Sequence, residues 1–272
     1  MLSPSPQPGA DLRPLRHWKT VSPADAARMI RSGATIGVSW LGDPLAAALE
    51  HAFREIRHPR DLTVVYATAH DAGRNHGLNL LAREGLVRRV VGGQWHPVAR
   101  LQMLAAANRI EAYSLPVGVI HRLFRDIADG LPGHLSRSGL GTFADPRHGG
   151  GRLNRRTREQ LVRLVQPAGD DALLYRGFPI DVGLLGVGFM ANTAAIAMSR
   201  EAVTIARAVR RCGGTIFAQT NRVGTLEKLP PSLVEAPDTL VDYLIAADPR
   251  DRSVETFAPL TPPPPGLRRL TH

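Results

Sequence analysis

The stretch GLGTFADPRHGGGRLN, from Gly139 to Asn154, is the starting point for interpreting this chain. It holds five glycines and a proline within sixteen residues. Glycine loses the most backbone entropy on ordering and proline removes a backbone donor, so neither a helix nor a strand tolerates this composition. The stretch is predicted to be a loop, and long loops in compact domains are typically functional. Composition alone fits a phosphate cradle, a subunit contact or a flexible insert.

The 272-residue chain has a net charge of +10, and 43% of its residues are apolar, enough for a sizeable core. Only two of its 34 basic residues are lysines, so the charge follows a chain-wide preference for arginine. Arginines also cluster between residues 152 and 158, but no aromatic residues alternate with them to stack on bases. We therefore expect no nucleic-acid partner, and favour surface solvation or binding of a phosphorylated cofactor.

Cysteine and histidine usage argues against metal sites and disulfides. The single cysteine, Cys212, excludes an internal disulfide framework, fits the reducing cytoplasm and is expected to be a buried structural thiol. The closest histidine pairs are six and seven residues apart, not the three or four that a helical zinc site would use, so no metal is expected. The longest uncharged run, Val182 to Met198, is interrupted by glycines and polar residues, and no membrane association is expected.

Strand and helix patterns alternate along most of the chain, which predicts a three-layer α/β/α fold with a mostly parallel sheet. The expected domain spans residues 20–248, between a disordered lead-in at 1–19 and a proline-rich tail or linker at 249–272. Strands are predicted at residues 34–38, 62–67, 87–91, 110–113, 173–175, 180–185, 215–219 and 240–246. Helices are predicted at residues 22–33, 43–56, 78–83, 97–108, 119–128, 157–165 and 199–210.

Generic catalytic motifs are missing from the sequence. No G-x-G-x-x-G opens a helix after a strand, and there is neither a P-loop nor a G-x-S-x-G elbow. By generic motifs alone, the chain is an α/β protein of unknown activity.

The order of residues in the glycine-rich stretch is more specific than its composition. GLGTF-x-DPR-x-GG-x-x-N resembles the glycine-rich segment of family I CoA-transferases of the propionate/acetate CoA-transferase type. The runs GLNLLAREGLVRRVVGGQW and RIEAYSLPVGVIHRLFRDIADGLPG are similar to further family segments in the same order, as are FPIDVGLL, MSREA and LVDYLIAA. The resemblance extends from about Thr20 to Ala247 and implies the CoA-transferase-like α/β fold of the α half.

The resemblance also implies a chemistry. In such enzymes a glutamate attacks an acyl-CoA, and the glutamyl–CoA thioester that follows passes CoA to a second carboxylic acid. That glutamate belongs to the β half, and none of the nine glutamates in this chain lies in its motif. The resemblance therefore implies no catalytic residue here, activity only with a β-type partner in a homo- or hetero-oligomer, coenzyme A as substrate, and no metal.

Three departures from the family pattern stand out. The P-Q-G of the family is Pro116-Val117-Gly118, and a valine has no amide to stabilise an oxyanion. The G-G-F turn reads Val38-Ser39-Trp40. The polar R-G-T-x-A-D-x-x-G-N stretch, which the resemblance implies is a loop facing the other half, has become residues 186–195, from Gly186 to Ala195. These changes leave open a non-catalytic scaffold or regulatory subunit, or a variant that hydrolyses thioesters.

The resemblance places the residues nearest the acyl group in three segments. These are the turn at Ser39 and Trp40, the segment Pro116-Val117-Gly118 and the glycine-rich loop. Val117 is expected to be a wall rather than a donor. The candidate substrate-binding and CoA-binding residues are Ser39, Trp40, Val117, Gly118, Gly139, Gly141, Thr142, Phe143 and Asn154.

Overall fold

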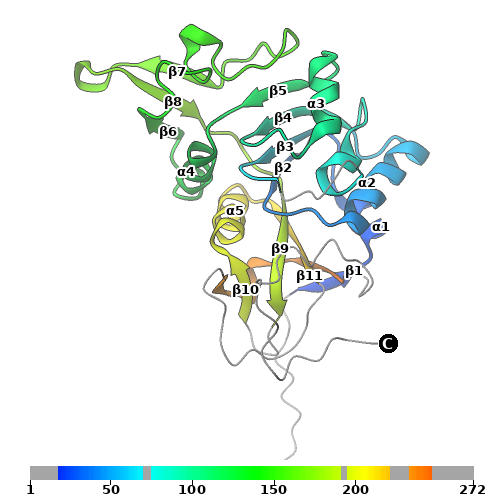
Figure 1. Ribbon diagram of the computed structural model, residues 1–272. Coiled ribbons are helices and arrows are strands. Elements are labelled where there is room, and N and C mark those ends of the chain that lie inside the picture. Colours follow the sequence, from blue (N-terminus) through cyan, green and yellow to red (C-terminus); the bar gives the residue numbers. More distant parts are fainter. Residues whose placement is uncertain (1–17, 70–74, 191–194, 221–232, 247–272) are drawn as a thin grey trace, which may run out of the picture.

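A computed structural model describes residues 18–69, 75–190, 195–220 and 233–246, and eight of its strands form one parallel path (Figure 1). The order β1-β13-β11-β9-β2-β3-β4-β5 confirms the predicted, mostly parallel sheet. The bounds are β1 Lys19–Val21, β13 Tyr243–Ala246, β11 Thr215–Thr220, β9 Val182–Met190, β2 Thr35–Val38, β3 Leu62–Tyr66, β4 Val87–Gly92 and β5 Glu111–Ser114.

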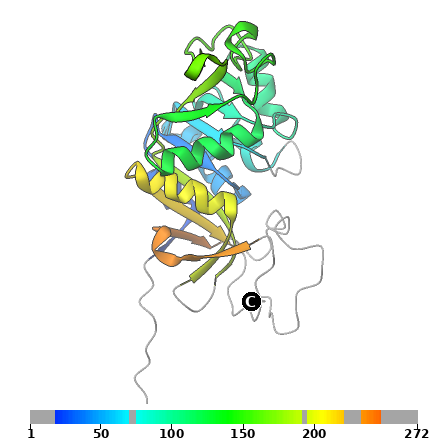
Figure 2. The same ribbon diagram turned by 90° about the vertical axis from the view of Figure 1, so that its left-hand side faces the viewer.

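Helices cover both faces of this sheet, which confirms the three-layer α/β/α fold (Figures 1 and 2). On one face lie α1 (Pro23–Met29), α2 (Asp43–Ile56) and α3 (Ala99–Ala106). On the other, α4 (Val117–Ala128) and α5 (Arg200–Arg211) pack side by side. Short 3₁₀ turns are η1 Gly77–Leu81, η2 Pro146–His148, η3 Pro167–Gly169 and η4 Asp238–Leu240.

Local sequence signals explain most of these elements. Every residue of β3 is buried, as expected of a strand covered on both faces. Val64 and Val65, which are adjacent in this strand, belong to two different hydrophobic cores. Helix α1 begins after Ser22, whose hydroxyl accepts a hydrogen bond from the backbone N–H of Asp25. Ser199 caps α5 in the same way.

The close packing of α4 and α5 on the sheet depends on a glycine in its centre. A Cβ atom on Gly37 of β2 would lie 3.0 Å from a methyl group of Ile205 in α5 and 3.4 Å from the ring of Phe124 in α4. A larger residue there would therefore push both helices away from the sheet.

A second, three-stranded antiparallel sheet was not predicted. It consists of β6 (Gly133–Ser136), β8 (Ala172–Arg176) and β7 (Val162–Val165), with β8 in the middle. The helix predicted at residues 157–165 is wrong, because Val162–Val165 forms a strand that pairs with β8. Val162 is buried and Arg163 is exposed, an alternation that suits one covered sheet face.

The predicted loop at residues 186–195 is also corrected in its described part. Strand β9 continues to Met190 and pairs antiparallel with β10 (Ala195–Ser199), which in turn pairs with β12 (Leu233–Pro237). The described fold begins at Trp18, whose side chain is buried in the core. The rest of the predicted lead-in and the tail at 249–272 lie outside the described residues. Cys212 is exposed at the end of α5, so its predicted burial is wrong.

Replacing Gly37 with leucine tests the packing of the two helices. We expect Gly37→Leu to lower the free energy of unfolding by about 1–3 kcal/mol or more, because the new side chain overlaps α4 and α5. The matched control is Gly118→Leu, since a Cβ on Gly118 meets nothing within 4 Å. Urea unfolding followed by circular dichroism measures both. Equal effects of the two substitutions would contradict the packing described.

Candidate functional site

The central strands of the sheet create the place where ligands bind in open α/β folds. From β2 the chain builds β3, β4 and β5 toward one edge, whereas β9, β11 and β13 extend toward the other. The direction of winding therefore changes between β2 and β9, and ligands bind at the carboxyl ends of strands beside such a switch point. Ser39 follows β2 there, and its hydroxyl accepts a hydrogen bond from the N–H of Gly186 in β9, at 3.3 Å.

A buried glutamine lies on the other side of this switch point. Gln219, near the end of β11, is 1% exposed, and its Oε1 accepts a 3.0 Å hydrogen bond from the N–H of Gly42. Among the described residues its Nε2 has no partner. A Cβ on Gly42 would lie 2.8 Å from this Nε2 and 2.6 Å from the ring of Trp40, so only glycine fits. The sequence analysis missed Gln219, although a glutamine ending an apolar strand was a usable signal.

Val117 and Gly118 lie at the same carboxyl edge, at the start of α4. A Cβ on Gly93, which follows β4, would lie 2.9 Å from Cγ2 of Val117. Val117 is half-buried and Gly118 is exposed, whereas Ser39 and Trp40 are buried in this chain. The structure thus places these four predicted site residues at the carboxyl edge of one sheet, two of them beneath its surface.

A largely buried carboxyl group lies at this edge, between α4 and α5. Glu201 in the first turn of α5 accepts a hydrogen bond of 3.5 Å from the hydroxyl of Thr68, just after β3. Its Oε1 is 3.7 Å from Nδ1 of His121 in α4 and has no hydrogen-bond partner among the described residues. Burial raises the pKa of Glu201 to about 7, and burial lowers the pKa of His121. At neutral pH much of Glu201 therefore carries a proton.

The glycine-rich loop is folded onto the outer edge of β5. The N–H of Ser114 donates to the carbonyl of Gly151, and the N–H of Leu153 donates to the carbonyl of Ala112. Gly149, Gly150 and Gly151 all have positive φ, which favours glycine. The loop therefore runs antiparallel to β5, from its carboxyl end at Gly151 toward its amino end.

Asp145 fixes the first half of the loop. Its buried carboxylate accepts hydrogen bonds from the guanidinium of Arg147, at 2.7 Å, and from the N–H of Gly141, at 2.9 Å. The Arg147 guanidinium, with the backbone N–H groups, holds the pKa of Asp145 well below its usual range. Gly139 and Gly141 adopt positive φ, and the hydroxyl of Thr142 donates to the carbonyl of Gly139. These loop residues thus take part in the loop's own structure.

Phe143 differs from the rest of the loop because its ring is 53% exposed. Its carbonyl accepts a hydrogen bond from the N–H of Gly151, which packs against Ser114 and Leu115. Phe143 therefore lies near the carboxyl end of β5 with its ring free to contact a ligand or another chain.

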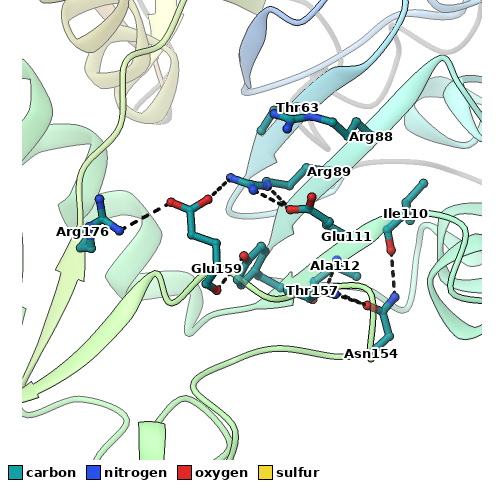
Figure 3. A network of polar contacts seen from close by, with 11 residues as sticks. Thr63, Arg88, Arg89, Ile110, Glu111, Ala112, Asn154, Thr157, Glu159 and Arg176 are labelled. Carbon is teal, nitrogen blue, oxygen red and sulfur yellow. Dashed lines mark hydrogen bonds and ion pairs between the residues drawn. The ribbon is translucent and has the colours of Figure 1, made fainter.

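Asn154 lies away from the carboxyl end of β5, and the nitrogen and oxygen of its side-chain amide both have hydrogen-bond partners within the chain (Figure 3). Its Nδ2 donates to the carbonyls of Ala105 and Ile110, at 2.7 and 2.9 Å, and its Oδ1 accepts from the N–H and hydroxyl of Thr157. Both amide hydrogens are used. Asn154 joins the loop to the end of α3 and to the residue before β5, so the structure gives it a bridging role.

An ion-pair network continues from this junction to the small sheet (Figure 3). Arg89 of β4 lies 2.8 Å from Glu159 and 2.6 Å from Glu111 of β5. Glu159 also lies 3.5 Å from Arg176 of β8. This network ties the edge of the main sheet to the small sheet.

Over the described residues no cluster of three or more potential ligands could hold a metal ion. Within the same residues, no helix has the length and apolar character required to cross a bilayer.

Comparison with known proteins identifies the family of this chain. A family model described as coenzyme A transferase matches residues 20–247. The chain belongs to this family. Caffeate CoA-transferase of Acetobacterium woodii is 32% identical over 248 residues, covering 88% of this chain and 47% of the relative. Acetate CoA-transferase YdiF of Escherichia coli K12 is 31% identical over 252 residues, with the same two coverages.

Solved structures agree with this family. The apoenzyme of the acyl-CoA transferase YdiF from E. coli O157:H7 matches with a TM-score of 0.78 and 29% identity, over 92% of this chain and 50% of that one. A YdiF thioester complex with CoA matches equally well, with a TM-score of 0.78. Glutaconate CoA-transferase of Acidaminococcus fermentans, at 15% identity and a TM-score of 0.59, shares the fold. The chain spans about half the length of the curated relatives it matches.

Substitution of Glu201 tests its buried, proton-binding state. The folded chain binds this proton more tightly than the unfolded chain, so wild-type stability falls as pH rises from the ordinary pKa of 4.5 to about 7. Glu201→Gln is never charged at this position. We expect its free energy of unfolding, relative to that of the wild type, to be about 2–3 kcal/mol higher at pH 8 than at pH 4.5. Urea unfolding at both pH values measures this. Glu55→Gln, at an exposed site on α2, should show no such change; a constant wild-type-to-Glu201→Gln difference would contradict the prediction.

Substitution of Asn154 separates a bridging role from ligand contact. Asn154→Asp leaves the carbonyls of Ala105 and Ile110 without their donor and places a negative charge beside them, so we expect a loss of about 1–3 kcal/mol in unfolding free energy. Phe143→Ala in the same loop should change stability by less than about 0.5 kcal/mol, because its ring is exposed. Urea unfolding of both variants is the measurement. Unchanged stability in Asn154→Asp would show that its hydrogen bonds do not hold the loop.

Proposed function

We propose that this chain is the α-type half of a CoA-transferase that moves CoA between an acyl-CoA and a small carboxylic acid. It is active when a β-type half supplies the glutamate nucleophile. The observation that carries the proposal is coverage: the match takes in 88% of this chain but only 47% of the curated relatives. The remaining half of the reaction machinery then belongs to the partner.

The chemistry divides naturally between two halves. The partner's glutamate attacks the acyl-CoA carbonyl, which gives an acyl–glutamyl anhydride and releases the CoA thiolate. The thiolate then attacks the glutamyl carbonyl, releasing the first carboxylate and leaving a glutamyl–CoA thioester. The incoming carboxylate attacks this thioester, which releases the CoA thiolate and forms a second acyl–glutamyl anhydride. The thiolate then attacks the acyl carbonyl of this anhydride, giving the new acyl-CoA and freeing the glutamate. Each carbonyl attack builds negative charge on an oxygen, so the α half contributes by placing donors and excluding water.

The carboxyl edge described above is suited to this contribution. The hydroxyl of Ser39 accepts from the N–H of Gly186 at the switch point and keeps its own hydrogen to donate. The Nε2 of Gln219, which has no partner among the described residues, is a second donor there. Val117 contributes an apolar wall at the start of α4. Two of these groups lie beneath the surface of the isolated chain, so on this proposal the partner completes the site and opens access to it.

One observation favours a second candidate, a scaffold or regulatory subunit of the same fold. Val117 stands where the family pattern has a glutamine, and its side chain donates no hydrogen bond. Loss of one oxyanion donor costs on the order of 100-fold in rate. A subunit retained for assembly alone would need no such donor.

The two candidates differ in what the chain does beside a β-type partner. We expect the chain, co-produced with a β-type chain that carries the glutamate, to transfer CoA from acetyl-CoA to propionate. Hydroxylamine or borohydride should trap the glutamyl–CoA adduct. A β-type reading frame directly downstream would identify the partner to use. Absence of both transfer and adduct across a panel of small acids would contradict the enzyme and favour the scaffold.

Restoring the missing amide tests the role of position 117. We expect Val117→Gln to raise kcat/KM of the two-chain enzyme by roughly tenfold, because a donor returns to the oxyanion. Val117→Leu is the matched control, since it changes volume without adding a donor. Steady-state CoA transfer measures both, and equal rates in the two variants would show that no oxyanion forms near this residue.

A further inference from the structure

A shallow pocket of about 540 Å³ lies beside the end of the glycine-rich loop, away from the switch point. Gly149 and Leu153 line it, and Asn154 and Thr157 lie at the junction shown in Figure 3. Its other lining residues are three arginines, Arg152, Arg155 and Arg158. We refer to it as the arginine pocket.

The neutral polar side chains of the arginine pocket are fixed. Asn154 uses both amide hydrogens and its oxygen within the chain. The hydroxyl of Thr157 accepts from the N–H of Ala112 and lies within hydrogen-bond distance of Oδ1 of Asn154. These groups are committed to joining the loop to β5, so a ligand would find its free polar partners among the arginines.

No carboxylate in the described part of the chain pairs with these three guanidinium groups. Among the described residues, the side chains of Arg155 and Arg158 have neither an ion pair nor a hydrogen bond. Arg152 donates through Nε to the carbonyl of Gly149 at 2.9 Å, which leaves its two terminal nitrogens available. The nearby acid Glu159 is already shared by Arg89 and Arg176. Three like charges around one hollow repel one another until an anion binds between them.

The lining also indicates the kind of anion. Guanidinium groups bind phosphate oxygens in a bidentate manner, so three of them suit a ligand with more than one phosphate. Leu153 is 48% exposed in the pocket and offers an apolar surface to the body of such a ligand. The open space around Gly149, where a Cβ would meet nothing within 4 Å, lets a bulky group approach the loop.

We propose that the arginine pocket binds a ligand with clustered phosphates on a heterocyclic body. Two sources share this chemistry: the 3′-phosphorylated adenosine diphosphate end of coenzyme A, and a free nucleotide. The coenzyme A source rests on the proposed function, whereas the preference for clustered phosphates does not. No aromatic side chain lines the pocket to stack on the bases of a nucleic acid.

Calorimetric titration of the full 272-residue chain with adenosine 3′,5′-bisphosphate tests the pocket. We expect Arg155→Gln and Arg158→Gln each to weaken binding about tenfold, because each removes one guanidinium–phosphate contact. Arg155→Lys should bind with intermediate affinity, since it keeps the charge but loses the bidentate geometry. Arg54→Gln, at an exposed site on α2, is the matched control and should bind as the wild type. Melting temperatures confirm that each variant is folded.

Two outcomes overturn the proposal. One is bisphosphate binding that is absent or is unchanged in both glutamine variants. The other is binding of duplex RNA through these arginines while no small phosphate ligand binds.

Two further titrations distinguish coenzyme A from a free nucleotide as the ligand of the pocket. Tighter binding of coenzyme A than of dephospho-CoA, with the difference lost in Arg158→Gln, supports the pocket and assigns it to coenzyme A. Equal binding of ATP and coenzyme A, weakened alike by the substitution, supports the pocket and assigns it to a free nucleotide. CoA transfer is measured separately with the β-type partner, so failed transfer beside intact bisphosphate binding contradicts the proposed function alone.

Discussion

The free edge of the parallel sheet at β5 is the constraint on which much of this structure depends. An edge strand presents unpaired N–H and C=O groups, and the glycine-rich loop pairs with them at Ser114 and Ala112. To follow β5 closely the backbone turns through positive φ at Gly149 to Gly151, which explains the run of glycines. The side chain of Asn154 then secures the loop at the amino end of the strand.

The same edge carries the small antiparallel sheet. Arg89 lies between carboxylates on β5 and on the segment leading into β7, so one half-buried guanidinium joins the two sheets. Two guanidinium groups, on Arg89 and Arg176, meet the two carboxylates of Glu111 and Glu159, so the charges at this junction are balanced. In the arginine pocket, a few residues earlier, three guanidinium groups have no acid partner among the described residues. Other described arginines also lack an ion pair, and what sets these three apart is that they line one hollow.

Much of the fold could be predicted because its signals are local. The buried run of β3 and the serine caps of α1 and α5 can be identified without any tertiary information. The segment at 157–165 could not, because its interactions are non-local: Thr157 binds the backbone of Ala112, and Val162–Val165 pairs with β8. Intrinsic helical propensity is weaker than such pairing.

The candidate site was predicted only in part, for a related reason. The motifs place Ser39 and Val117 after parallel strands, and residues that follow parallel strands share one edge of the sheet. Gln219 and Glu201 went unrecognised because an isolated glutamine or glutamate in a sequence does not reveal whether it is buried. Its place in the motif predicts that Asn154 contacts a ligand, whereas the structure shows its side-chain amide hydrogen-bonded within the chain. A motif residue can preserve the shape of a loop rather than touch a substrate.

The electrostatics of the two regions fit different parts of one proposed substrate. At the carboxyl edge, burial raises the pKa of Glu201 to about 7, so its negative charge is much reduced at neutral pH. A fully ionised carboxylate there would repel the carboxylates and thiolate of the proposed transfer, whereas a protonated one does not. The arginine pocket carries the opposite bias and favours the multiply charged phosphates. If one acyl-CoA reaches from the carboxyl edge to the arginine pocket, its reacting end meets neutral donors and its phosphates meet the arginines. This arrangement matches the substrate, which carries its negative charge on the phosphates and not on the thioester.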